Sequence, residues 1–149
     1  MRPRVRINDL HLPGRVEQGE GFLSPDEARR RRLLVVDDDP GVQELLEEVL
    51  SGAGYEVQTA FNSDEAVEHL TQDTYDGLVL DLVLPEEDGL ALYDRVLQVS
   101  PHLRDRVIFI SGEAREHQLR RVTRKTGAMV LKKPFNVLDL MRLLQERGL

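Results

Sequence analysis

The sequence predicts an α/β fold in which a parallel sheet of five strands is covered by helices on both faces. Two observations support this prediction. Short strand-like segments alternate with longer segments of helical periodicity, and this alternation occurs five times between residues 33 and 146. Parallel strands need crossover connections, which are usually helices, so this alternation indicates a doubly wound sheet.

The first strand and helix are the clearest of these elements. Residues 33–36 form an apolar run that ends at three consecutive aspartates, as expected for a strand buried on both faces. Asp39 is a favourable N-cap and Pro40 a favourable first helical residue. Apolar residues then recur with helical spacing from Val42 to Leu50, and Gly52 is expected to stop this helix.

The other elements follow from the same patterns. A short apolar run predicts each strand, and a periodic segment that often starts with a capping or acidic residue predicts each helix. The remaining predicted strands are residues 55–60, 77–80, 107–110 and 129–131. The remaining predicted helices are residues 63–70, 90–99, 113–125 and 137–146, the last capped by Asn136.

Residues 1–31 are predicted to be an N-terminal extension, partly disordered, ahead of a single domain at residues 32–149. Residues 1–23 lack periodicity and contain several Gly and Pro residues. Ser24, Pro25 and Glu27 are typical of a helix start and predict a short helix near residues 25–32. The arginine run at its end is interpreted as a solvated face.

The composition excludes several classes of protein. The chain has no cysteine, which rules out disulfides and thiolate metal sites. No apolar run is long enough to cross a bilayer or to serve as a signal peptide, so we expect no membrane insertion and a cytoplasmic location. Residues 33–149 contain 12 basic and 22 acidic residues, so direct binding to nucleic acid is not expected.

Acidic residues follow two strands that are expected to be neighbours. In a flavodoxin-like sheet of order 2-1-3-4-5, the chain reverses direction between strands 1 and 3, and ligands bind outside the carboxyl ends of the strands there. Asp37, Asp38 and Asp39 leave strand 1, and Asp81 leaves strand 3. Two such charges about 4 Å apart repel by roughly 4 kcal/mol at an effective dielectric of 20. Oxygen ligands alone favour Mg²⁺, and an Asp can also form an acyl phosphate.

Two further strand ends carry polar residues. Ser111 follows the fourth strand and Lys133 follows the fifth. Each alone is weak support for a site, because Ser often caps a helix and Lys is usually a surface residue. At the same edge of the sheet as the acids, however, a hydroxyl and an ammonium can both donate to the oxygens of a phosphoryl group.

These motifs together resemble the receiver domain of bacterial two-component response regulators. The resemblance spans about residues 32–149, and although each motif is weak alone, all four occur in order, each at a predicted strand end. The motifs are Asp37-Asp38-Asp39-Pro40, then Asp81 with Pro85 and Gly89, then Ser111-Gly112, and finally Lys133-Pro134-Phe135.

The resemblance implies a signalling role in a phosphorelay. Asp81 would accept a phosphoryl group from a histidine kinase or a histidine phosphotransfer domain and so switch contacts with a downstream protein. Such a domain is not an enzyme beyond its own phosphorylation and dephosphorylation. The implied Mg²⁺ ligands are Asp38, Asp81 and the backbone carbonyl of Val83, with Asp37 acting through coordinated water, and the implied contacts of the phosphoryl group are Ser111 and Lys133.

The resemblance also implies finer details and shows one departure. The Lys133-Pro134 peptide is expected to be cis, Gly112 to leave access for phosphate, and Val83 and Glu113 to tune the lifetime of the phosphorylated state. The stretch before Lys133 is one residue shorter than usual and lacks the aromatic residue of many receivers, which is similar to receivers of hybrid histidine kinases. This puts coupling through an aromatic residue in doubt, but not phosphorylation.

A basic face on the fourth helix is either a partner surface or simply solvated. Its members are Arg115, Arg120, Arg121, Arg124 and Lys125.

Other functions remain open on the sequence. A phosphatase of the haloacid-dehalogenase type would use Asp37 and Asp39, but Gly41 departs from the motif of that family. Such a phosphatase also needs a pair of acidic residues after the lysine, where this chain offers only Asp139. It would leave Asp81 without a role. A degenerate receiver that only binds proteins would normally have lost one of these acids or the lysine. A flavodoxin-like cofactor binder would need a phosphate loop that is missing. A stand-alone regulator, a phosphorelay shuttle and a fragment of a hybrid kinase all fit.

Overall fold

A computed structural model describes residues 5–6, 22–23, 30–112, 115–128 and 130–149. Its body is a five-stranded sheet of order β4-β3-β5-β6-β7, in which all neighbouring strands are parallel. This is the predicted order 2-1-3-4-5. The strands are β3 (Arg32–Val36), β4 (Glu56–Ala60), β5 (Gly77–Asp81), β6 (Val107–Ser111) and β7 (Val130–Lys132).

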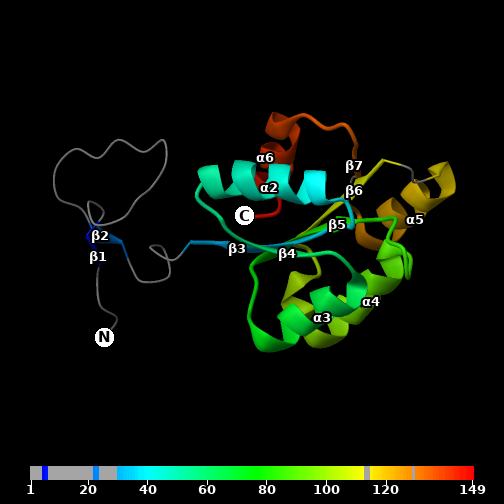
Figure 1. Ribbon diagram of the computed structural model, residues 1–149, viewed down its shortest axis with the longest axis horizontal. Helices are drawn as coiled ribbons and strands as arrows, with labels where there is room; N and C mark the ends of the chain where they lie inside the picture. Colours follow the sequence, from blue (N-terminus) through cyan, green and yellow to red (C-terminus); the bar gives the residue numbers. More distant parts are fainter. Residues whose placement is uncertain (1–4, 7–21, 24–29, 113–114, 129) are drawn as a thin grey trace.

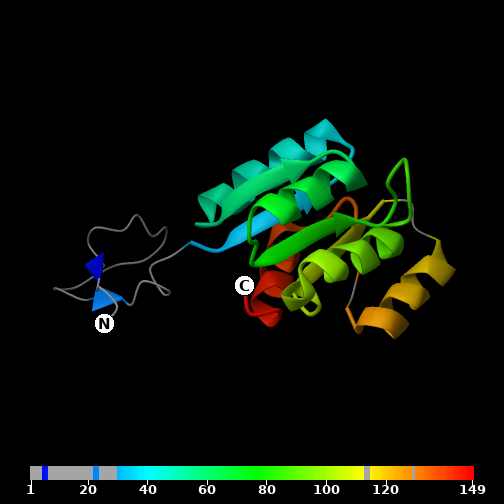
Figure 2. The ribbon, with the colours of Figure 1, turned by 90° about the horizontal axis from the view of Figure 1, so that it is seen from below.

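Helices cover both faces of this sheet. Figures 1 and 2 show α2 and α6 on one face and α3 and α4 on the other. The helices are α2 (Pro40–Gly52), α3 (Ser63–Gln72), α4 (Gly89–Val99), α5 (Glu116–Thr126) and α6 (Val137–Glu146), with a 3₁₀ turn, η2 (Pro101–Leu103), after α4. The predicted α/β class is therefore confirmed. Among the described residues, every helix is too short or too polar to cross a lipid bilayer.

The strands separate two hydrophobic cores. Along β3, Leu34 and Val36 belong to the core under α3 and α4, whereas Leu33 and Val35 belong to the core under α2 and α6. Successive strand side chains point to opposite faces, so a strand covered on both sides must be apolar at every position. This explains the continuous apolar run from which the sequence predicted the strand.

The caps predicted at Asp39 and Asn136 are confirmed, but the predicted start of α5 is wrong. The side chains of Asp39 and Asn136 accept hydrogen bonds from Gly41 N and Leu138 N, both at 2.8 Å, at the starts of α2 and α6. The predicted start of the fourth helix at residue 113 was too early. Residues 113 and 114 lie outside the described residues, and Arg115 is an extended N-cap whose backbone N–H donates to Gln118 Oε1 at 3.0 Å.

The described parts of the extension differ from the prediction. Val5–Arg6 (β1) and Phe22–Leu23 (β2) pair as antiparallel strands, which are too short to show any sequence alternation. The helix predicted near residues 25–32 lies mostly outside the described residues. Its last residue, Arg32, instead begins β3 and pairs with Glu56 of β4. Asp76 also holds the backbone of Arg32, whose N–H donates to Asp76 Oδ2 at 2.7 Å and whose carbonyl accepts from Asp76 N at 2.8 Å.

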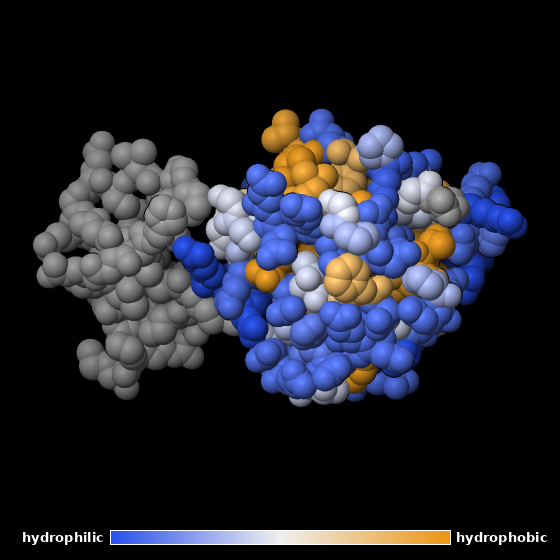
Figure 3. Space-filling view, in the orientation of Figure 1, coloured by the Kyte–Doolittle hydropathy of each residue, from blue (hydrophilic) through white to orange (hydrophobic). Residues whose placement is uncertain are grey.

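The surface is mainly hydrophilic on the face drawn in Figure 3. On that face, hydrophobic atoms gather mostly over α6. Leu138, in the first turn of α6, is 75% exposed, the largest value among the exposed apolar residues of the described chain.

Candidate functional site

Three carboxylates converge at the carboxyl ends of β3 and β5. Asp37 directly follows β3, and Asp81 is the last residue of β5. One oxygen from each of Asp37, Asp38 and Asp81 lies within 4.8 Å of the others. The structure therefore brings together the acids that the sequence placed at neighbouring strand ends, as the change of chain direction between β3 and β5 requires.

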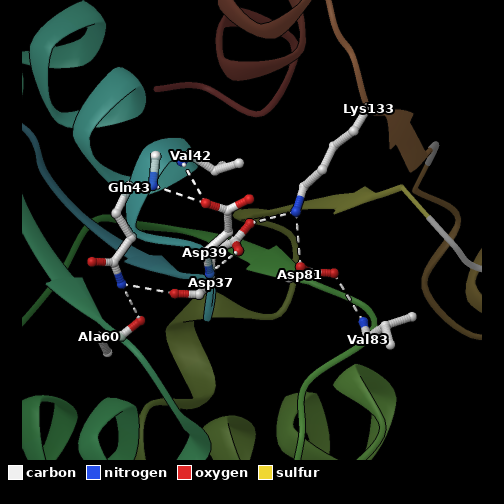
Figure 4. A network of polar contacts seen from close by, with 9 residues as sticks. Asp37, Asp39, Val42, Gln43, Ala60, Asp81, Val83 and Lys133 are labelled. Carbon is white, nitrogen blue, oxygen red and sulfur yellow. Dashed lines mark hydrogen bonds and ion pairs between the residues drawn. The ribbon is translucent and has the colours of Figure 1, made fainter.

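Lys133 joins two of these acids. Its Nζ lies 2.7 Å from Asp37 Oδ2 and 2.9 Å from Asp81 Oδ2 (Figure 4). The lysine directly follows β7, and its backbone N–H donates to the Ser111 carbonyl at 2.8 Å, which extends the β6–β7 ladder. Three carboxylates and one ammonium leave a net charge of about −2, which a divalent cation would balance.

Burial dominates the electrostatics of Asp37. Its side chain is fully buried, and Oδ1 accepts from Asp39 N at 2.9 Å. Burial raises the pKa of Asp37 and the charge of Asp81 adds to this effect, while the hydrogen bonds from Lys133 and Asp39 oppose it without cancelling it. Asp37 is thus a carboxylate whose charge is only partly compensated.

Lys133 keeps its proton in this environment. Burial alone would lower its pKa, but the hydrogen bonds to Asp37 and Asp81, together with their charges, more than offset burial and raise the pKa above the usual value. The ammonium is therefore a permanent donor between the two acids at neutral pH.

The loop after β5 orients Asp81. The Asp81 side chain is nearly buried, and its Oδ1 accepts the backbone N–H of Val83 at 2.9 Å. Gly89 packs so closely that a Cβ there would lie 2.7 Å from the Asp81 carbonyl oxygen and 2.7 Å from Leu82 Cα. The motif glycine is thus required by backbone packing directly behind the acid.

An open cleft of about 380 Å³ lies over these groups. Gly112 lines it, and a Cβ on Gly112 would make only ordinary contacts, 3.5 Å from Lys133 Cβ and Cδ. Ser111, the last residue of β6, is buried just before this glycine. The residues that line the cleft are Asp38, Asp39, Asp81, Val83, Leu84, Pro85, Gly112 and Lys133.

Two finer predictions have different outcomes. The Lys133-Pro134 peptide is cis, as expected. Glu113, predicted to influence the phosphorylated state, lies outside the described residues, so that role stays a prediction.

The sequence reasoning missed Gln43. This side chain is 5% exposed, and its Nε2 donates to the carbonyls of Asp37 and Ala60 at 2.8 and 2.7 Å. The sequence did contain a signal, because Gln43 precedes Leu46 by three residues and Leu50 by seven, and so occupies the core-facing side of α2. A polar residue in such a position needs buried hydrogen-bond partners.

The basic face of α5 is partly neutralised. Lys125 Nζ pairs with Asp94 Oδ2 at 2.7 Å, and Arg121 Nη1 lies 3.6 Å from Asp88 Oδ2. Arg120 and Arg124 line a shallow groove of about 370 Å³ on the same helix. Binding of a partner to this face stays a prediction.

The acid that a phosphatase would need lies on a helix, away from this cluster. Asp139 is in the first turn of α6, where its Oδ1 accepts from Arg142 Nη2 at 2.7 Å. The metal-competent acidic cluster of the described residues consists of Asp37, Asp38 and Asp81.

Known proteins share this architecture. A family model described as the response regulator receiver domain matches residues 33–145. The response regulator receiver protein CpdR of Brucella abortus is 32% identical over 116 residues, which cover 78% of this chain and 95% of that protein. A CheY-like receiver domain protein of Methanospirillum hungatei is 25% identical with a TM-score of 0.72, over 80% of this chain and 94% of that one.

A further solved structure carries a modification. It is a response regulator protein from Burkholderia pseudomallei with a phosphorylated aspartic acid, a calcium ion and citrate. It is 28% identical to this chain with a TM-score of 0.68, and the match covers 77% of this chain and 66% of that one.

Proposed function

Because this chain belongs to the response regulator receiver domain family, we propose that Asp81 accepts a phosphoryl group from the phosphohistidine of a histidine kinase or a histidine phosphotransfer domain. The observation that carries this proposal is the bridge from Lys133 Nζ to Asp37 and Asp81, beside a third carboxylate. The phosphorylated aspartic acid of the Burkholderia pseudomallei relative supports it.

The transfer is a substitution at phosphorus. A carboxylate oxygen of Asp81 attacks the phosphorus, the new O–P bond forms, and the bond from phosphorus to the histidine nitrogen breaks. The electron pair of that bond stays on the imidazole, which then takes up a proton. Such a transfer requires little covalent chemistry from the protein, so positioning and charge compensation provide most of the catalysis.

Residues around Asp81 have separate tasks. The backbone N–H of Val83 holds one carboxylate oxygen of Asp81 and fixes the orientation of the group. Lys133 already lies at hydrogen-bond distance from the other oxygen, so its ammonium can pair with a phosphoryl group attached there. The Ser111 hydroxyl, at the adjacent strand end, is proposed as a donor to the same phosphoryl group.

The donor set fits Mg²⁺. It contains only oxygen ligands, its net charge is about −2, and the raised pKa of Asp37 indicates a carboxylate that lacks full compensation. Asp38, Asp81 and the Val83 carbonyl would hold the cation directly, with Asp37 acting through coordinated water. When bound, Mg²⁺ neutralises negative charge that develops on the phosphoryl oxygens.

The function of this domain would be to switch contacts rather than to turn over a substrate. A phosphorylated Asp81 would change the affinity for a downstream protein, and the only chemistry of the domain would be its own phosphorylation and dephosphorylation. We expect a cytoplasmic location for this exchange. The alternative of a degenerate receiver that only binds proteins predicts that neither Mg²⁺ nor a phosphoryl analogue binds.

Binding of beryllofluoride, a phosphoryl analogue, tests the proposal. With Mg²⁺ present, the parent protein should bind beryllofluoride at Asp81, and ¹⁹F NMR should show a bound signal that EDTA abolishes. Asp81→Asn should lose this signal. Asp39→Asn is the matched control, because it removes a neighbouring charge yet keeps a good N-cap for α2, and it should bind like the parent. Equal binding by Asp81→Asn would refute the assignment.

Phosphotransfer identifies the donor. Autophosphorylated histidine kinases from a panel should be mixed with the parent and with Asp81→Asn, and transfer of label should be followed over seconds to minutes. We expect a cognate kinase to label the parent and to leave Asp81→Asn unlabelled. Label on both proteins would place the phosphoryl group elsewhere.

A further inference from the structure

We infer that Gln43 is a positioning residue for the cation site, an inference that rests on the proposed function. Gln43 lies in the first turn of α2 and is almost completely buried. Figure 4 shows its amide nitrogen between the backbone carbonyls of Asp37 and Ala60, to which it donates at 2.8 and 2.7 Å. The amide therefore joins the ends of β3 and β4 directly beneath the acids.

The location of these carbonyls explains why a donor is needed. The last bond of the β3–β4 ladder runs from Asp37 N to the Ala60 carbonyl at 3.1 Å. Beyond it the strands end, so the buried Asp37 carbonyl must find another donor. The Ala60 carbonyl already accepts from Asp37 N, and its second lone pair is free for a further bond. A glutamine amide has two N–H groups, so Gln43 can serve both carbonyls with one side chain.

This contact reaches the metal-binding acids through the peptide bond. The Asp37 carbonyl and the Asp38 nitrogen share one planar peptide unit. The hydrogen bond from Gln43 to that carbonyl therefore fixes the orientation of the peptide plane between Asp37 and Asp38. The Asp37 side chain is held separately, because its Oδ1 accepts from Asp39 N. Gln43 thus constrains the directions in which both Asp37 and Asp38 present their carboxylates.

The helix supports Gln43 rigidly. The Gln43 backbone N–H donates to the Asp39 carbonyl at 3.1 Å, and Leu46 and Leu50 on the same face of α2 are fully buried. The backbone from which the amide projects is therefore held in place by the packing of the helix. A supporting group that orients a ligand typically changes metal affinity by 10–100-fold when it is removed. Gln43 contacts the backbone of its ligand rather than the carboxylate, so we expect a loss at the lower end of this range.

The test is Mg²⁺ affinity measured by isothermal titration calorimetry. Gln43→Met keeps the length of the side chain but removes both donors, and its Kd for Mg²⁺ should rise roughly tenfold. Gln43→Asn keeps the amide on a side chain that is one methylene too short to reach both carbonyls, and its Kd should rise less. Val49→Ala, farther along α2 and half-buried, is the control for a change in stability alone: its Tm should fall while its Kd matches the parent.

The outcomes separate the two proposals. If the parent does not bind Mg²⁺, the proposed function fails. If the parent and Val49→Ala bind equally and the folded Gln43 variants also bind with the parental Kd, the positioning role is overturned while the proposed function stands. Gln43→Asn decides alone if Gln43→Met does not fold.

Discussion

At the scale of single residues, the site concentrates buried charge of one sign. Asp37 is fully buried, Asp81 is 4% exposed, and Lys133, whose side chain is 20% exposed, is the cation that lies between them. Like charges at this spacing repel by a few kcal/mol at the effective dielectric of a protein. The repulsion between these carboxylates is thus only partly offset by Lys133, and a bound cation would reduce it further.

The pH dependence of stability should report this repulsion. Burial, followed by the charge of Asp81, raises the folded-state pKa of Asp37. The folded protein thus binds more protons than the unfolded chain, and the free energy of unfolding falls as pH rises from about 4 through the folded pKa. In EDTA, Asp37→Asn should remove this fall and raise the Tm at pH 7 by a few degrees.

Thermal unfolding between pH 4 and 8 measures the effect, with Asp139→Asn, an exposed acid outside the site, as the control. A parent Tm that rises across this range while that of Asp37→Asn stays flat would show that Asp37 is stabilising as a charged group. Identical curves for the two proteins would show that Asp37 does not cause the pH dependence.

Lys133 should stabilise the metal-free fold. Lys133→Met leaves two buried carboxylates without their shared donor, so we expect the free energy of unfolding to fall by about 1–3 kcal/mol in EDTA. Because Mg²⁺ at the proposed site would compensate the same carboxylates, it should restore part of the loss. Urea unfolding with and without Mg²⁺ measures both effects, and Lys125→Met, on an exposed ion pair, should change stability by less than about 1 kcal/mol.

At the scale of elements, the connection between β5 and α4 sets the position of Asp81. Gly89 packs against the backbone at the end of β5, and Asp88 caps α4 by accepting from Leu90 N at 2.7 Å. On the outer side, Arg95 of α4 contacts Glu87 of this connection and lies 3.2 Å from Asp64 of α3. The connection is therefore fixed by the close packing of Gly89 against the end of β5 and by the ion pairs of Arg95.

Gly89→Ala should disturb this connection. Its Cβ would meet backbone atoms at 2.7 Å, which cannot rotate away, so we expect a loss of about 1–3 kcal/mol in stability and weaker Mg²⁺ binding because Asp81 moves. Gly52→Ala, at the end of α2, is the matched control. A Cβ at this position would have no neighbouring atom within 4 Å, so we expect this variant to be neutral or slightly stabilising. Equal stability of both variants in urea would contradict the packing argument.

At the scale of the whole molecule, the site joins segments that are distant along the chain. Asp37 directly follows β3, Asp81 ends β5 and Lys133 directly follows β7, and only the folded sheet brings them together. A cation that binds this assembled site binds the unfolded chain far more weakly. Metal binding and global stability are therefore linked.

Mg²⁺ should accordingly raise the Tm of the parent. At a concentration 100 times the Kd, the gain is about 2.7 kcal/mol, or about 5–11 °C for a chain of this size. Asp38→Ala removes an exposed ligand candidate without touching the core and should lose most of this shift. NaCl at matched ionic strength should produce little of it, and an equal shift with NaCl would indicate screening rather than binding.

The sequence by itself determined the α/β class and the acids at the strand ends, whereas the strand order came from the flavodoxin-like fold that this pattern fits. These features depend on local signals: the period of the apolar residues, the capping propensity of Asp39 and Asn136, and the polar residues that follow four of the five predicted strands. Its errors were also local. Arg32 was assigned to a helix because an apparent helix start precedes it, but its backbone pairs with Asp76, which is 44 residues away.

Only the tertiary structure decided which groups touch. The Lys133 bridge, the two carbonyls held by Gln43 and the backbone contact of Gly89 each join residues that no local pattern relates, apart from the core-facing spacing of Gln43. Sequence periodicity reports which face of an element is buried, whereas a contact depends on how two elements pack and in what register. Sequence patterns therefore identify the site residues individually, and the folded sheet brings these residues together in one site.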